Sequence, residues 1–187
     1  MPRYIDENRL FEATVAVFAD VGYRATTTQA IATRARVNEA TLFRRYGAKA
    51  TLINAALTHV LAGSPFAGVA TTNDVTADLI ALVRAYTETA QKYGGAVTTL
   101  LTEVPRHPEL REAMAALMPN LANAAEVIAA HQKSGRVSPG DPLQKLVTLI
   151  APLLVFGLWG RTGATPKGPS LDALTLVIEF LDGHGAP

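Results

Sequence analysis

Apolar residues recur at helical spacing through the N-terminal part of the chain. Over 6–21 they fall three or four positions apart, which predicts an amphipathic helix that Gly22 ends. Thr27 and Asn38 each precede a short helical pattern, and both side chains can accept a hydrogen bond from a first-turn N–H. The pattern therefore predicts two short capped helices after the first, and a fourth helix over 48–62.

The same periodicity resumes after 63–74, a segment rich in Gly, Ser, Thr and Pro that we expect to be a linker. A helix is predicted over 75–93 and a shorter one over 96–104. The break between them rests on Gly94 and Gly95, because glycine weakens a helix interior.

The C-terminal part carries Pro both at helix starts and inside helical patterns. A long helical pattern begins at Pro108, and Pro119 inside it should kink or split the helix. Asp141 followed by Pro142 is a strong start signal for an apolar helix that ends near Trp159. A loop over 160–170 and a last helix over 171–181 complete the chain. No segment alternates in the manner of a strand, so the predicted fold class is all-α, with about nine helices.

Composition narrows the classes of protein. The 187 residues are 49% hydrophobic and 18% charged, which suits one domain or a small module joined to a larger one. The chain has no Cys, which excludes disulfides, thiolate metal sites and cysteine nucleophiles and fits a reducing cytoplasm. Charges near the N-terminus interrupt any signal peptide, and the apolar stretch 146–160 is too short to span a bilayer comfortably. We therefore expect a cytoplasmic protein without a membrane partner.

Positive charge is concentrated near the N-terminus. The formal net charge of +1 divides into +3 over residues 1–50 and −2 over 51–187. The stretch "ARVNEATLFRRYGAK" (35–49) alone holds four cations and one acid. A polyanionic partner is therefore expected to meet this part of the chain.

Two short helices joined by a tight turn, the second one basic, form a helix-turn-helix pattern. Glu39 and Thr41 lie early in the basic helix, where side chains usually meet base edges; Glu can accept from cytosine N4, and Thr can touch a thymine methyl. Arg44 and Arg45 project about 100° apart, so that one can face the groove and the other a phosphate. Lys49 begins the next helix, whose free N–H groups can also hold a phosphate. On charge and caps alone, a DNA-binding helix and a merely solvated one are equally favoured.

The sequence "GYRATTTQAIATRARVNEATLFRRYGAKATLINAAL" (22–57) resembles the N-terminal DNA-binding domain of the tetracycline-repressor (TetR) family. The match covers about residues 5–60, and it rests on Gly22, Tyr23, Ala25, Thr27, Ile31, Ala32, Ala35, Val37, Leu42, Phe43, Tyr46, Lys49 and Leu52. The resemblance implies that Thr27 or Thr28 and Lys49 hold phosphates, that 38–45 supplies base and backbone contacts, and that Tyr46 packs inside. The expected DNA-binding set is Thr27, Thr28, Gln29, Arg36, Asn38, Glu39, Thr41, Phe43, Arg44, Arg45, Tyr46 and Lys49.

Four positions depart from the usual pattern of the family. Arg36 stands where Gly is common, Asn38 where Ser or Thr is common, and Phe43 where Tyr is common. Phe43 lacks the hydroxyl that would bond to a phosphate, and Arg36 offers a replacement cation nearby. Ala30 lacks the carboxylate that would complete the cap at Thr27.

The resemblance also implies two functional domains: residues 1–50 bind DNA, and residues 51–187 bind an effector and dimerise. The helix over 48–62 connects the two domains. The implied function is a ligand-responsive regulator, most often a repressor released from a palindromic double-stranded DNA operator by a small molecule. A homodimer through Leu146–Trp159 and Leu171–Leu181 is expected, although the same apolar stripes also suit a simple core. Ligand-lining candidates, suited to a hydrophobic or aromatic effector, are Tyr86, Tyr93, Leu100, Met114, Met118, Phe156 and Trp159.

Two other classes of protein compete with a regulator. An enzyme is disfavoured because the four His residues show no metal-ligand spacing and "GLWGRTG" lacks the Lys-Ser/Thr of a phosphate loop, so neither a metal nor a cofactor is expected. The alternative is an all-helical protein–protein adaptor that keeps a helix-turn-helix only for packing. The salt dependence of binding to random DNA separates the adaptor from a regulator.

Overall fold

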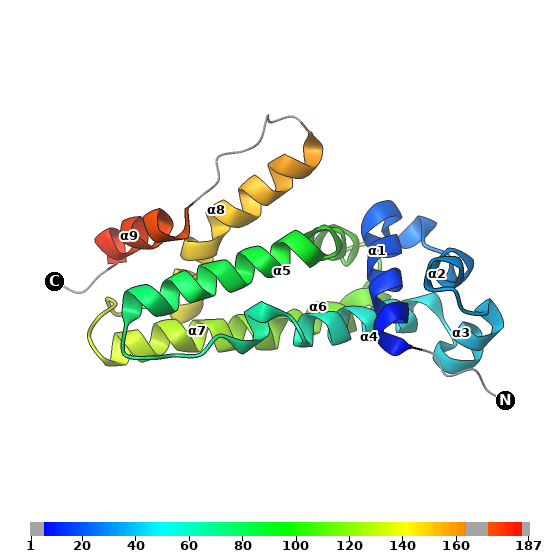
Figure 1. Cartoon of the computed structure of the whole chain (residues 1–187), viewed down its shortest axis with the longest axis horizontal. Coiled ribbons are helices and arrows are strands. Elements are labelled where there is room, and N and C mark those ends of the chain that lie inside the picture. Colours follow the sequence, from blue (N-terminus) through cyan, green and yellow to red (C-terminus); the bar gives the residue numbers. More distant parts are fainter. Residues whose placement is uncertain (1–5, 164–171, 185–187) are drawn as a thin grey trace. The chain divides into compact units, whose positions relative to one another are not determined.

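The computed structural model describes residues 6–163 and 172–184, and within these ranges it contains helices and no β-strand. The all-α prediction is therefore confirmed (Figure 1). The α-helices are α1 (Glu7–Ala25), α2 (Thr28–Ala35), α3 (Glu39–Tyr46), α4 (Lys49–Ala62), α5 (Val75–Glu103), α6 (Arg111–Ala115), α7 (Leu117–Lys133), α8 (Pro142–Thr162) and α9 (Ala173–His184), with short 3₁₀ helices η1 (Pro65–Gly68) and η2 (Pro108–Leu110).

The chain divides into two compact units. The first, which we call the head, contains residues 1–63 and 93–118; the second, the body, contains 64–92 and 119–187. Each unit has its own buried apolar cluster. Helix α5 contributes residues to both units, so each unit consists of two separate stretches of the chain. The predicted functional division at residue 50 is a different boundary, and it stays a prediction.

The head is built on α1 and α4, which pack along each other and carry α2 and α3. Both predicted caps are present: the side chain of Thr27 accepts from the Ala30 N–H, and that of Asn38 accepts from the Ala40 N–H. The predicted stop at Gly22 is partly confirmed. Gly22 has a left-handed φ of 76° and interrupts the helical geometry, yet α1 continues as far as Ala25.

Helix α5 contradicts the predicted break at Gly94 and Gly95, because it runs unbroken from Val75 to Glu103. Glycine costs a helix about 1 kcal/mol relative to Ala, and burial of neighbouring side chains can outweigh that cost. Tyr93, Ala96 and Leu100 flank the two glycines and are buried in the core of the head. Tertiary packing therefore decides the course of this helix.

The predicted split in the next helical pattern occurs, but not at Pro119. Helix α6 ends at Ala115 and α7 begins at Leu117, which places Pro119 in the first turn of α7. Proline is tolerated there because the first-turn N–H groups have no intrahelical partner. The predicted kink or split is therefore partly confirmed, because the helix divides at Ala116, three residues before Pro119.

Several side chains in the N-terminal half of α8 are buried in the body, and most side chains in its C-terminal half are exposed. Asp141 caps α8 as predicted by accepting from the Gln144 N–H, and α8 extends to Thr162. By length and composition, α8 and the stretch Pro108–Lys133 could each cross a membrane. Trp159 on α8 is 51% exposed within the single chain. The predicted helix start at Leu171 and most of the loop before it lie outside the described residues, and α9 begins at Ala173.

Candidate nucleic-acid interface

The turn between α2 and α3 is closed by two backbone hydrogen bonds. The N–H of Arg36 donates to the Thr33 carbonyl at 3.2 Å, and the N–H of Val37 donates to the Ala32 carbonyl at 3.0 Å. Arg36 itself has φ 56°, the one positive φ of a non-glycine residue among residues 6–163 and 172–184. A left-handed residue is what a tight helix end requires, and glycine adopts it with least strain. The chain thus places a cation at a position that usually favours Gly.

Helix α3 is fixed to the head by one buried side chain. Leu42 is 1% exposed and joins Ile31 in the core of the head. The neighbouring Phe43, Arg44 and Arg45 are all exposed. The basic helix therefore has one side that faces the core and another that faces outward.

Thr28 and Glu39 are joined directly. The hydroxyl of Thr28 donates to Oε1 of Glu39 at 2.6 Å, across eleven positions of sequence. Thr28 is the first residue of α2 and Glu39 is the first residue of α3, so this bond ties the starts of the two helices together. A distance of 2.6 Å is at the short end of the normal range for an O–H···O hydrogen bond.

The two adjacent arginines have different surroundings. Arg45 forms an ion pair with Glu7 at the start of α1, and its guanidinium lies 5.7 Å from the ring centre of Tyr46. No ion pair within the described part of the chain involves Arg44. The DNA-free head therefore holds Arg45 in place and leaves Arg44 open.

Lys49 makes contacts that its position in the sequence did not suggest. Its ammonium donates to the carbonyls of Tyr23 at 2.8 Å and Thr26 at 2.9 Å, with a longer bond of 3.4 Å to Arg24. It also lies 4.4 Å from the ring centre of Tyr23. Lysine thus satisfies carbonyls at the end of α1 that have no intrahelical donor. The phosphate contact predicted for Lys49 stays a prediction.

Tyr23 links this lysine to η2. Burial raises the pKa of Tyr23 to about 12, and a hydrogen bond to the Glu109 carboxylate adds to the rise. The Tyr23 ring also lies 4.6 Å from the ring of His107. These contacts are internal to the head, and sequence reasoning missed them because the partners lie far apart along the chain.

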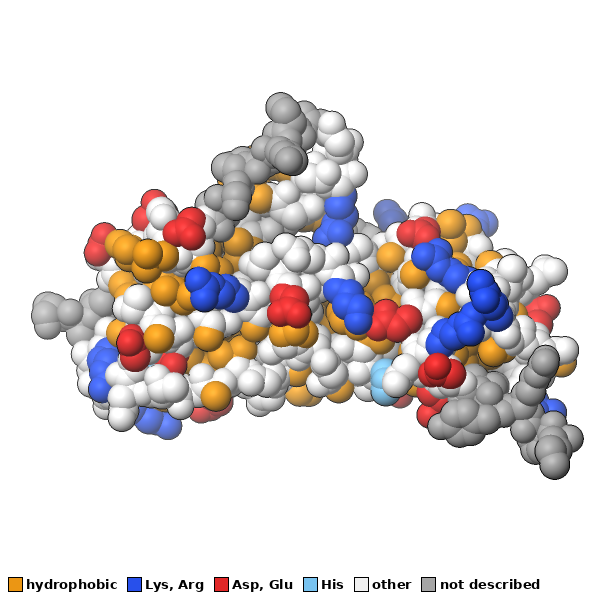
Figure 2. Space-filling model, viewed as in Figure 1, with side chains coloured by type: hydrophobic (Ala, Val, Ile, Leu, Met, Phe, Trp, Pro, Cys, Tyr) orange, Lys and Arg blue, Asp and Glu red, His pale blue; other side chains and the backbone are white. Residues whose placement is uncertain are grey.

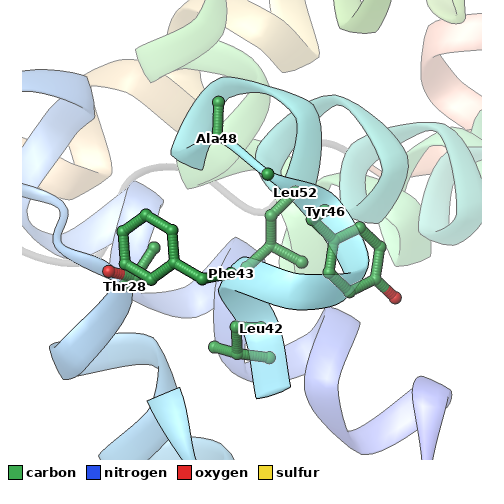
Figure 3. A pocket seen from close by; sticks show the side chains of 7 residues that line it. Thr28, Leu42, Phe43, Tyr46, Ala48 and Leu52 are labelled. Carbon is green, nitrogen blue, oxygen red and sulfur yellow. The ribbon is translucent and has the colours of Figure 1, made fainter. Parts of the chain in front are cut away.

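A shallow hollow lies beside α3 (Figure 3). Its lining consists of Thr28, Leu42, Phe43, Tyr46, Gly47, Ala48 and Leu52. Phe43 is 54% exposed, and Figure 3 shows its ring next to the Thr28 side chain. Tyr46 is half-buried as expected, and its hydroxyl has no hydrogen-bond partner among the described residues. Burial raises the pKa of Tyr46 despite the nearby Arg45.

The predicted DNA-binding residues lie together on α2, the turn and α3, apart from Lys49 at the start of α4. Figure 2 shows basic and acidic side chains close together over the part of the molecule that Figure 1 labels α1 to α3. Glu7 was not among the predicted residues. Its place in the first turn of α1 gave only a general reason for an acid there.

The predicted ligand-lining residues are divided between the two units. Tyr93, Leu100 and Met114 belong to the core of the head, where the Tyr93 hydroxyl donates to Glu12 at 2.9 Å. Tyr86 packs on the core of the body. Phe156 and Trp159 meet edge to face on α8 with ring centres 5.4 Å apart, and Met118 is exposed.

Family models match both parts of the chain. Residues 10–56 match the model for bacterial regulatory proteins of the tetR family, and residues 69–174 match the tetracyclin repressor-like C-terminal domain. The chain belongs to the TetR family. Membership makes it a DNA-binding transcriptional regulator, and the helix-turn-helix of α2 and α3 is the family's DNA-binding motif.

Solved structures of TetR-family regulators share the fold over the whole chain. One from Marinobacter aquaeolei is 20% identical, with 100% of each chain covered and a TM-score of 0.74. One from Pseudomonas syringae pv. tomato is 22% identical, with 99% of this chain and 100% of that chain covered and a TM-score of 0.73. A putative transcriptional regulator from Saccharomonospora viridis, in complex with choline, is 20% identical, with 97% of each chain covered and a TM-score of 0.75. No curated protein matches the sequence significantly.

Proposed function

We propose that this TetR-family chain is a homodimeric repressor that a small molecule releases from a palindromic operator. The observation that carries the proposed operator contact is the outward face of α3, where Leu42 is buried and Phe43, Arg44 and Arg45 are exposed. A helix held from behind by one buried anchor can enter a major groove without losing its place in the fold. Such a regulator works in the cytoplasm, where its operator lies.

Phosphate and base contacts are assigned by exposure and chemistry. Arg36, Arg44 and Arg45 supply cations, and Thr27 and Gln29 supply neutral donors at the start of α2. Glu39, Thr41 and Phe43 face base edges, where a Phe ring suits a thymine methyl. Asn38 caps α3, and Tyr46 supports α3 from within the head.

A salt titration with three variants of the full chain tests this assignment. If one of Arg44 and Arg45 holds a phosphate, its replacement by Ala lowers the slope of log K against log[salt] by about one for every duplex. If the other contacts a base, its replacement lowers discrimination by about 1–3 kcal/mol. Arg84→Ala, at an exposed arginine of α5 in the body, is the matched control. Equal and negligible effects at Arg44 and Arg45 would contradict the groove assignment, and salt-independent binding would favour the adaptor.

The dimer is proposed to form through α8 and α9. Large apolar side chains on these helices stay exposed in the single chain: Val147, Leu154, Val155, Trp159, Leu174 and Ile178. An apolar surface of this extent is typical of a protein interface. Leu154→Glu is therefore expected to give monomers in sedimentation that lose operator binding, while the head stays folded.

The effector is proposed to bind in the body, next to Tyr86, Phe156 and Trp159. Burial raises the pKa of Tyr86 even though the cation of Arg161 acts in the opposite direction. A half-buried phenol and an aromatic pair suit a hydrophobic or aromatic compound. The choline complex of the Saccharomonospora regulator supports only the idea that a similar fold accepts a small molecule. Loss of binding to a screened aromatic effector in Tyr86→Ala, with DNA binding kept, is the expected result.

A further inference from the structure

The hydrogen bond between Thr28 and Glu39 joins two residues that the family resemblance places at the DNA surface. We propose that Thr28 is a positioning residue that fixes the Glu39 carboxylate to recognise a cytosine of the operator. This inference rests on the proposed function and concerns the specificity of the same site. Its starting point is the 2.6 Å distance from the Thr28 hydroxyl to Oε1 of Glu39.

The hydroxyl proton of Thr28 can be donated to only one acceptor at a time. A hydroxyl carries a single O–H donor, and in Thr28 that donor is used by Glu39. In Thr27 the hydroxyl oxygen instead accepts the Ala30 N–H at 3.1 Å, so its own proton remains free for a phosphate. The two neighbouring threonines therefore have different roles in this proposal: the Thr27 hydroxyl donates to a DNA phosphate, and the Thr28 hydroxyl donates to Glu39.

The hydrogen bond orders a side chain that is otherwise flexible. Glu39 is the first residue of α3, and a free Glu side chain loses rotamer freedom when it is fixed. In this head the bond to Thr28 has already fixed one carboxylate oxygen before DNA arrives. The direction of the carboxylate is therefore set within the head.

An ionised carboxylate selects among bases because it only accepts hydrogen bonds. Cytosine presents the N4 amino group as its donor in the major groove, whereas adenine places the N7 acceptor beside its amino group and guanine presents acceptors. With Oε1 held by Thr28, Oε2 is the oxygen left for the base. Within residues 6–163 and 172–184, the Glu39 carboxylate has no hydrogen bond or ion pair besides the one to Thr28.

The test is a selection from a random duplex library with the full chain, followed by binding to single-base variants of the enriched motif. Wild type, Glu39→Gln, Thr28→Val and Thr28→Ser are compared. Wild type is expected to enrich cytosine at one position in each half-site. Glu39→Gln is expected to change that position towards adenine, which Gln pairs with best.

Thr28→Val keeps the shape of the side chain and removes the donor. It is expected to lower cytosine preference fivefold or more at the Glu39 position only, and Thr28→Ser is expected to restore it. The preference is a ratio of two affinities measured on one sample, so it does not depend on the folded fraction. If Thr28→Val is too unstable to assay, Thr28→Ala makes the same comparison.

Several outcomes would overturn the inference. A uniform loss of affinity in Thr28→Val with an unchanged motif would assign Thr28 to a phosphate. If Glu39→Gln leaves the selected motif unaltered, Glu39 does not contact a base. Failure of the wild type to enrich any sequence would refute the proposed function itself, which is a different result from either of these.

Discussion

Replacement of Lys49 by Met distinguishes a structural role of Lys49 in the head from a contact with a DNA phosphate. The ammonium donates to carbonyls of Tyr23 and Thr26 at 2.8 and 2.9 Å, and Thr26 is fully buried. A hydrogen bond to a charged group contributes about 1.5–3 kcal/mol, and the partial exposure of Lys49 reduces that figure. Loss of two such bonds, with the carbonyls left unpaired, should lower the free energy of unfolding by about 2–4 kcal/mol.

Urea unfolding measures this loss. Far-UV circular dichroism follows the helices of both units, whereas Trp159, the single Trp of the chain, reports the body. The expected result is an earlier transition of the head with the Trp159 transition unchanged, and Lys133→Met on α7 is the matched control. An unchanged salt slope of DNA binding would assign Lys49 to the α1 carbonyls alone, whereas the predicted phosphate contact lowers the slope by about one. A change in unfolding free energy below about 0.5 kcal/mol, together with a slope lower by about one, would show instead that Lys49 holds a phosphate.

Two further predictions concern other charged groups. Glu7→Gln should release Arg45, so that binding to random duplex DNA strengthens and its salt slope steepens by up to about one, while unchanged binding would show that Arg45 does not reach DNA. Burial raises the pKa of Asp78, but hydrogen bonds from Thr72 and the contact with His131 outweigh burial and lower it. At pH values above its ordinary pKa, Asp78 therefore stabilises the body. This stabilisation is lost as the pH falls through the lowered pKa of Asp78. Asp78→Asn should flatten the acid limb of the stability profile, and an equally steep limb in the variant would contradict this.

Local signals in the sequence predicted the ends of helices well. Thr27, Asn38 and Asp141 cap helices as expected, since a capping bond involves residues only two or three positions apart. The buried anchor Leu42 was one of the positions on which the family resemblance rested. The course of α5 through Gly94 and Gly95 did not follow from local signals, because it depends on side chains from elsewhere in the head.

The candidate site was predicted as a set of residues but not as a set of contacts. The family resemblance placed Thr28, Glu39, Arg45 and Lys49 at the DNA surface. It could not show that Arg45 pairs with Glu7, 38 positions away, or that the Lys49 ammonium serves carbonyls of α1. Such partners are set by how α1, α3 and α4 pack, which no local pattern encodes.

The most direct test of the central claim is a protection assay of the full chain on the DNA upstream of its own gene. The account predicts protection of a palindrome whose half-sites lie about 34–36 Å apart, or a multiple of this, and loss of protection in Leu154→Glu. Protection should weaken steeply as salt is raised. A monomer in sedimentation that still protects a palindromic site tightly would contradict the proposed dimer. An absence of protection and of salt-dependent binding to duplex DNA would contradict the claim that α3 contacts an operator.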